Sequence, residues 1–109
     1  MDIDDKLTET MVRRILSVAE PERIILFGSA ASGQTTRDSD IDLLVLETSP
    51  TNIRKESVRI GDALRGLGFP FDVVVMSSRR FEESKDVIGG IAYPANKYGK
   101  VIYEATRAS

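Results

Sequence analysis

The stretch Leu26-Phe27-Gly28-Ser29, followed after ten residues by Asp40-Ile41-Asp42 and the apolar run Leu43–Leu46, decides the fold of this chain. It predicts one apolar strand that runs into a Gly-Ser turn, then a loop, then a second strand that begins with two acids. Alternate side chains of a strand project to opposite faces, so we expect both carboxylates to lie on one face and the apolar side chains to face a core.

Two neighbouring carboxylates repel each other unless a positive charge lies between them. A hard divalent cation is the simplest solution, because Mg²⁺ prefers carboxylate oxygens and keeps open positions for phosphates. A third acid, Asp72, stands near the start of another apolar strand, Phe71–Met76. If this strand lies beside the strand that begins with Asp40 and Asp42, the three acids Asp40, Asp42 and Asp72 predict a metal site that aligns a nucleoside triphosphate for in-line attack. The alternatives are a turn residue at Asp40 and a strand-entry residue at Asp72.

Gly28 and Ser29 predict a phosphate-binding turn. Glycine lets the backbone approach a phosphate closely, and the serine adds a hydroxyl beside backbone N–H groups. A short helix from Ser29 to Ser32 would point its N-terminus, which favours anions, at the same site. An ordinary strand-to-helix turn is the alternative, and the acids that follow ten residues later favour the phosphate cradle.

The composition limits the possible chemistry. The chain has 109 residues, 41% hydrophobic and 29% charged, which suits a single domain. It contains no cysteine and no histidine, which excludes thiolate and imidazole chemistry and leaves oxygen-ligand metals. A net charge of −2 argues against a nucleic-acid partner. The chain shows neither a long apolar run nor a leader, so we expect a cytoplasmic protein without a membrane partner.

The remaining elements are expected from apolar periodicity and capping residues. The first helix should present an apolar stripe, which we interpret as core, with a partner-binding face as the alternative. Together the elements predict an α/β fold whose strand order the sequence leaves open. The expected helices are a first helix ending near Ala19, one capped by Ser49 with Pro50 at its first position, and two at 79–85 and 91–98; the expected strands are 23–27, 41–47, 69–76 and 101–103.

In combination, Gly28-Ser29, Asp40-x-Asp42 and Asp72 resemble the signature of the minimal nucleotidyltransferases (MNT) of the DNA polymerase beta-like superfamily. The flanking words Ile24–Ser29 and Ser39–Leu43 agree with it, as does the ending Tyr98–Glu104, so the resemblance spans roughly residues 21–104. It implies a single nucleotidyltransferase domain at 1–109, with a short mixed sheet and helices packed mainly on one face.

The resemblance also implies an activity, in which AMP passes from ATP to a hydroxyl acceptor with Mg²⁺ or Mn²⁺ as cofactor. Asp40 and Asp42 would hold the metal that binds the triphosphate, and would share a second metal with Asp72, which helps to position or deprotonate the acceptor. Gly28 and Ser29 would hold the β- and γ-phosphates.

The chain departs from the family after the Gly-Ser pair. Many members have arginines in the words just after it, where this chain has Ala30 and Ser32. Arginine forks bind phosphates well, so we expect weaker triphosphate binding unless Arg37 or a partner supplies the charge.

The acceptor is suggested by the resemblance and by the short chain, which lacks the helical acceptor domain of antibiotic nucleotidyltransferases. Minimal nucleotidyltransferases pair with a separate helical HEPN protein, and act as antitoxins by adding AMP to a tyrosine of that toxin. This is the leading hypothesis. The alternatives are a small-molecule adenylyltransferase that shares its acceptor site with a second subunit, and a non-catalytic module that occludes its partner.

Overall fold

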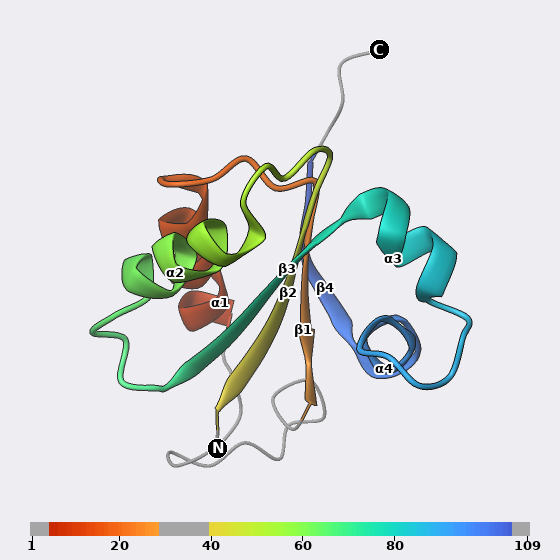
Figure 1. Cartoon of the computed structure of the whole chain (residues 1–109). Helices are drawn as coiled ribbons and strands as arrows, with labels where there is room; N and C mark the ends of the chain where they lie inside the picture. The colour runs from red at the N-terminus through yellow and green to blue at the C-terminus, as the bar shows by residue number, and fades with distance from the viewer. Residues whose placement is uncertain (1–4, 29–39, 106–109) are drawn as a thin grey trace.

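The computed structural model describes residues 5–28 and 40–105. Within these residues the chain forms four helices and a four-stranded sheet, arranged as helices on both faces of the sheet (Figure 1). In chain order the elements are α1 (Asp5–Leu16), β1 (Arg23–Phe27), β2 (Ile41–Glu47), α2 (Ile53–Ala63), β3 (Phe71–Ser77), α3 (Ser78–Ser84), α4 (Ala92–Tyr98) and β4 (Lys100–Glu104).

The sheet is short and mixed, as expected, with the strand order β3-β2-β1-β4. β1 pairs antiparallel with β2 and with β4, and β2 pairs parallel with β3. Parallel neighbours need a crossover connection, and here α2 supplies it between β2 and β3. The register of this parallel pair places Asp42 directly beside Asp72.

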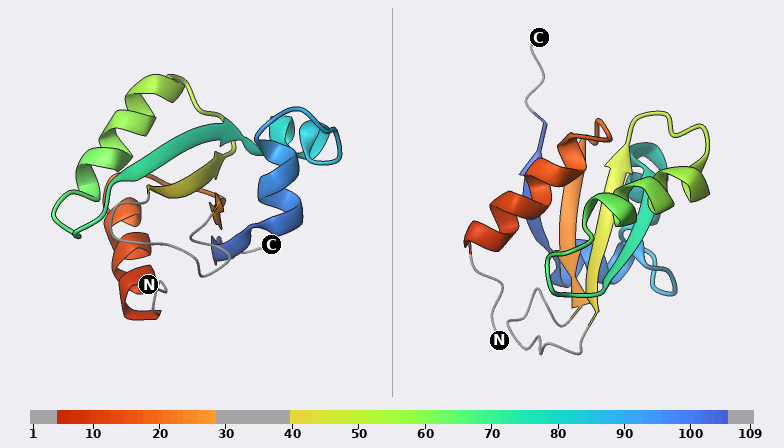
Figure 2. Two further views of the ribbon diagram at one scale, coloured as in Figure 1. Left: turned by 90° about the horizontal axis from the view of Figure 1, so that it is seen from below. Right: turned by 90° about the vertical axis from the view of Figure 1, so that its left-hand side faces the viewer.

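Two apolar clusters, one on each face of the sheet, form the core. The longer helices α1 and α2 cover the first face, where Ile24, Leu43 and Ile60 are buried (Figures 1 and 2). The seven-residue helices α3 and α4 cover the second face, where Ile25 and Leu44 meet buried residues of both helices. The longer helices therefore cover one face of the sheet, and a second layer of two short helices covers the other. The central strands are apolar on both faces, so each face needs a cover.

The helix boundaries differ from expectation by more than one residue in two places. α2 begins at Ile53 and not at Pro50, because the Asn52 side chain caps it by accepting a hydrogen bond of 3.0 Å from the Lys55 N–H. α1 ends at Leu16, before the expected Ala19. α3 is capped by Ser77, whose hydroxyl oxygen accepts a hydrogen bond of 3.1 Å from the Arg80 N–H.

The apolar stripe of α1 packs into the core along part of its length. Met11 and Ile15 are fully buried, whereas Leu16 at the end of the helix is 40% exposed.

None of the helices in the described ranges is long and apolar enough to cross a membrane.

Gly99 ends α4 where the helix meets the sheet. A Cβ atom at this position would lie 2.6 Å from Ile25 Cγ2 and would collide with the Ala95 carbonyl oxygen. Both neighbours are held by packing, since Ile25 and Ala95 are buried in the same cluster. Only glycine therefore lets the chain pass so close to β1.

We expect Gly99→Ala to lower the free energy of unfolding by about 1–3 kcal/mol, the usual cost of overpacking. Gly61→Ala is the matched control, because Gly61 lies in α2 with open space around it, and alanine there should stabilise the helix by up to about 1 kcal/mol. Urea denaturation of both variants measures the two effects. A Gly99→Ala midpoint equal to that of the unmodified chain would contradict the close packing.

Candidate active site

Three acids come together at the edge of the sheet where β1 ends and where β2 and β3 begin, at the lower end in Figure 1 and facing the viewer in the left view of Figure 2. Asp40 directly precedes β2, Asp42 is its second residue, and Asp72 is the second residue of β3. Asp40 and Asp72 are exposed, and Asp42 is partly buried between them and the sheet. The structure thus brings the three predicted acids to one place.

The electrostatics of this edge are unfavourable without a cation. Burial raises the pKa of Asp42, and repulsion from Asp72 and then Asp40 raises it further. In the part of the chain that the structure describes, none of the three acids forms an ion pair with a Lys or Arg side chain. A bound cation would relieve this repulsion.

Gly28 holds the end of β1 against Asp42. Its φ of +73° lies in the left-handed region, and a Cβ atom there would collide with the Asp42 Oδ2 atom. The neighbouring residue, Phe27, pairs directly with Asp42. The approach of a phosphate to Gly28 stays a prediction, and the group that the structure places against Gly28 is the Asp42 carboxylate.

The expected phosphate turn is described only in part. Ser29, the expected helix that starts there, the positions Ala30 and Ser32, and Arg37 lie outside the described residues. Of that turn, the structure describes Gly28. This glycine is exposed and lies beside the acids.

The chemistry of the acids fits a hard divalent cation, since all the donors are carboxylate oxygens. Their arrangement is looser than a closed metal cage, because no group of three or more acids among residues 5–28 and 40–105 is placed to hold one ion. Mg²⁺ is commonly bound by one or two carboxylates and completes its shell with water and substrate phosphates. Asp42 with one neighbouring acid therefore suits it.

The sequence model of the nucleotidyltransferase domain family matches residues 6–93, which include all three acids and Gly28. The chain belongs to this family. The match starts in α1 and ends in α4, so it spans three strands of the sheet and leaves β4 outside.

Solved structures share the fold of this nucleotidyltransferase domain. A toxin–antitoxin crystal structure with AMP-PNP superimposes with a TM-score of 0.67 at 20% identity, over 90% of this chain and 73% of the other. A nucleotidyltransferase structure from Sulfolobus solfataricus, itself described as putative, gives 0.61 at 20% identity, over 91% and 78%. A mutant of the toxin–antitoxin MntA-HpeT gives 0.63 at 18% identity, over 90% and 73%. None of the curated proteins compared with this chain matches it.

One further buried acid has no counterpart among the residues predicted from the sequence. Glu47, the last residue of β2, is only 8% exposed. Burial raises its pKa to about 7, helped by a hydrogen bond and repulsion from Glu56, while Arg59 acts in the opposite direction. Its signal in the sequence is an acid directly after the apolar run Leu43–Leu46, which is also what an ordinary strand terminus looks like.

In the absence of divalent ions, we expect Asp42→Asn to unfold at the same urea concentration as the unmodified chain or at a higher one. The substitution removes the repulsion from Asp72 and Asp40 and keeps the side-chain shape. Millimolar Mg²⁺ should then stabilise the unmodified chain and leave Asp42→Asn unchanged. Asp86→Asn, an exposed acid after α3, is the control and should respond to Mg²⁺ like the unmodified chain. An equal Mg²⁺ response in Asp42→Asn would rule out Asp42 as a ligand.

Stability should also depend on the protonation of Glu47. Its pKa is about 7 in the folded chain against an ordinary value of 4.5, so the folded state binds more protons between these values. The free energy of unfolding should therefore fall as pH rises from 4.5 to 7, by on the order of 1–3 kcal/mol, and then level off. Asp42 adds a change of the same sign. Urea denaturation from pH 5 to 8 should show a smaller decrease in Glu47→Gln, and the full decrease in the surface control Glu83→Gln.

Proposed function

We propose that this chain transfers AMP from ATP to a hydroxyl acceptor with Mg²⁺ or Mn²⁺ as cofactor. The observation that supports this best is the direct pairing of Asp42 with Asp72 across β2 and β3, with Gly28 closed against Asp42. Two acids of a nucleotidyltransferase domain are thereby held side by side at an open edge. Membership of the family supports the reaction class.

The proposed roles of the acids follow from their positions. Asp42 and Asp40 would hold the divalent ion, which neutralises charge on the triphosphate. Asp72, on the neighbouring strand and exposed, would position the acceptor hydroxyl and take its proton. No imidazole competes for the role of base, because the chain contains no histidine. Gly28 and Ser29 would hold the β- and γ-phosphates.

We further propose that the acceptor is a tyrosine of a HEPN-family toxin and that the chain is its antitoxin, acting in the cytoplasm as one domain, 1–109. Two of the similar folds belong to structures described as toxin–antitoxin, and one of these contains AMP-PNP, an analogue of ATP. The exposed setting of Asp72 is compatible with a protein side chain as acceptor, because such an acceptor must reach the site from outside.

Occlusion of the toxin without catalysis is the second candidate. Ala30 and Ser32 stand where many members of the family have arginines, which would weaken triphosphate binding. In this case the acids would be a remnant, and neutralisation would survive their removal.

Incubation of the purified chain with ATP, Mg²⁺ and its co-purified helical partner tests the proposal. Intact-mass spectrometry should find the partner heavier by one AMP, attached to a tyrosine. Asp72→Asn should slow the modification by about 100- to 10,000-fold, the usual contribution of a positioned base. Asp86→Asn should modify the partner at the unmodified rate.

Neutralisation of the toxin by Asp42→Asn without any added mass would favour occlusion. Transfer of AMP to a small alcohol or aminoglycoside, with the partner left unmodified, would show that a small molecule is the acceptor.

A further inference from the structure

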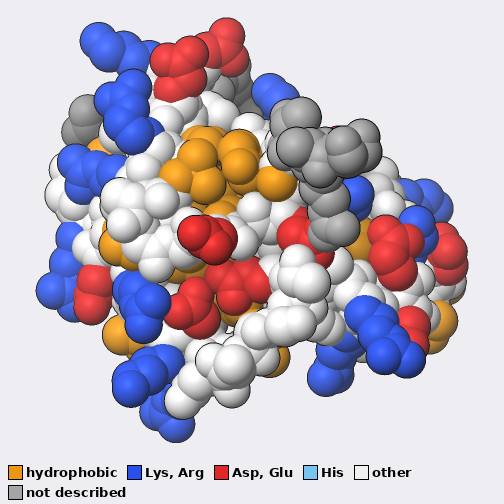
Figure 3. Space-filling model, turned by 90° about the horizontal axis from the view of Figure 1, so that it is seen from above, with side chains coloured by type: hydrophobic (Ala, Val, Ile, Leu, Met, Phe, Trp, Pro, Cys, Tyr) orange, Lys and Arg blue, Asp and Glu red, His pale blue; other side chains and the backbone are white. Residues whose placement is uncertain are grey.

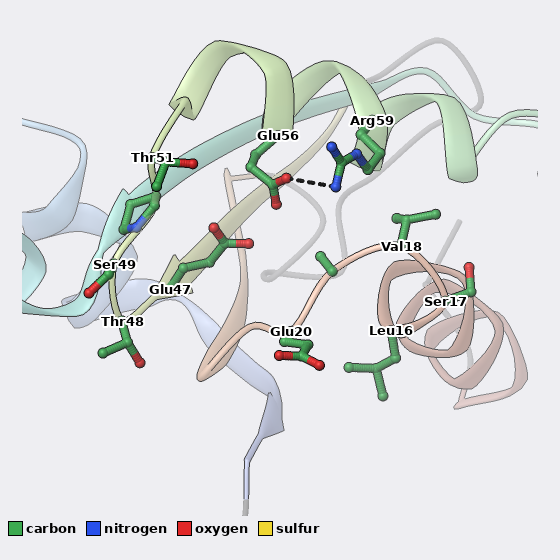
Figure 4. Close-up of a pocket in the computed structure, with 12 residues that line it drawn as sticks. Leu16, Ser17, Val18, Glu20, Glu47, Thr48, Ser49, Thr51, Glu56 and Arg59 are labelled. Carbon is green, nitrogen blue, oxygen red and sulfur yellow. Dashed lines mark ion pairs between the residues drawn. The ribbon is translucent and has the colours of Figure 1, made fainter.

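A cavity lies at the opposite end of β2 from the candidate active site. It has a volume of about 620 Å³ and opens between the end of α1, the end of β2 and the start of α2 (Figure 4). Asp42 and Glu47 are separated by five residues, or about 17 Å of strand. They also project to opposite faces of the sheet, because one number is even and the other odd. The two sites are therefore independent in space.

Glu47 is the buried acid of this cavity. More than nine-tenths of the residue is buried, yet its carboxylate lines the cavity and points across it toward Glu56 (Figure 4). Among the described residues no Lys or Arg side chain forms an ion pair with it. The hydrogen-bond partner of Glu47 is the Glu56 carboxyl. The two groups can share this hydrogen bond only while one of them is protonated.

The charges that line the cavity do not balance. Glu20, Glu47 and Glu56 carry three carboxylates, and Arg59 is the cation that faces them. Arg59 is already engaged, since its Nη1 atom lies 3.0 Å from Glu56 Oε1 while half of its side chain is exposed. Viewed from above, acidic side chains gather near the middle of this end of the molecule (Figure 3). A buried carboxylate without a cation is costly, and the raised pKa of Glu47 reflects that cost.

We propose that this cavity binds an organic cation, a guanidinium or primary ammonium group, between the carboxylates of Glu47 and Glu56. The flat guanidinium fork offers several N–H donors and pairs well with carboxylates. Apolar side chains at the rim, those of Leu16, Val18 and Pro50, suit the aliphatic stem of such a cation.

An organic cation fits this cavity better than a metal ion does. In the described residues no group of three or more acids is placed to hold a metal, so the carboxylates of this cavity form no cage. The remaining polar groups are hydroxyls, which accept N–H hydrogen bonds well; they belong to Ser17, Thr48, Ser49 and Thr51.

Titration with ethylguanidinium chloride, followed by two-dimensional amide NMR at pH 7.5 and constant ionic strength, tests the proposal. We expect saturable shifts in residues 16–20 and 47–59, and no such shifts with tetramethylammonium chloride, which has no N–H donor. Glu47→Gln and Glu56→Gln should each weaken binding about tenfold or more, the loss expected for one charged hydrogen bond. Glu83→Gln is the matched control on α3 and should bind as the unmodified chain does.

The affinity should also rise with pH between 5 and 8, because the cation competes with the proton that Glu47 and Glu56 share. Glu20 and Arg59 are the other charged groups that face this pair. Absence of saturable shifts, equal shifts with tetramethylammonium, or unchanged binding in Glu56→Gln would each overturn the proposal. The last result decides the question even if Glu47→Gln fails to fold.

The source of the cation is resolved by a parallel titration with N-acetylarginine methylamide. Binding at least tenfold tighter than that of ethylguanidinium would identify an arginine side chain of a partner protein, and weaker binding would identify a free small cation. AMP transfer plays no part in these measurements, so their failure and the failure of the proposed function are distinguishable.

Discussion

The candidate site depends on the parallel register of β2 and β3. Asp42 lies beside Asp72 because Ile41 pairs with Phe71, and each later residue of β2 pairs with the corresponding residue of β3. A shift by one residue would turn Asp72 to the other face of the sheet and bury it against α2. The register is held by the apolar side chains that follow, since Val75 must face α1 and α2 while Leu44 faces α4. Core packing on both faces thereby positions two carboxylates that repel each other.

β2 carries an acid at each end, and the two acids differ in their surroundings. Asp42 is partly open to solvent at the edge where Gly28 closes β1 against it. Glu47 is buried on the opposite face, under the start of α2. Between them the strand is buried throughout. The same strand therefore presents one acid to an open edge of the sheet and another to a cavity on the opposite face.

Much of the fold could be predicted from periodicity alone. The strands at 23–27 and 41–47 were predicted with correct bounds, because an apolar run between polar turns has few other interpretations. The predicted start of α2 was wrong because Ser49-Pro50 and Asn52 are both good helix starts. The sequence alone does not decide between them. The apolar central strands indicate a cover on both faces of the sheet, but the sequence of a short helix such as α4 does not reveal which face it will cover.

For the candidate site, the sequence identified Asp40, Asp42 and Asp72 through their places at strand starts. Their proximity needed the register, which is a long-range property of the packed sheet. The contact between Gly28 and Asp42 could not be predicted either. A glycine indicates that some group lies close to the backbone, and only the fold shows that this group is the Asp42 carboxylate. Glu47 had no distinguishing pattern, because its burial results from the loop and helix that fold over it.

The parallel pairing of β2 with β3 also has a consequence for how the chain folds. Asp42 and Asp72 are thirty residues apart in sequence, with the whole of α2 between them. The antiparallel pair β1–β2 joins residues much closer in sequence, so loop closure costs it less. Contacts between distant residues form late, and parallel strands are slow to pair. The two carboxylates should therefore meet only after β1 and β2 have paired, so that a partly synthesised chain that ends before β3 lacks the Asp42–Asp72 pair.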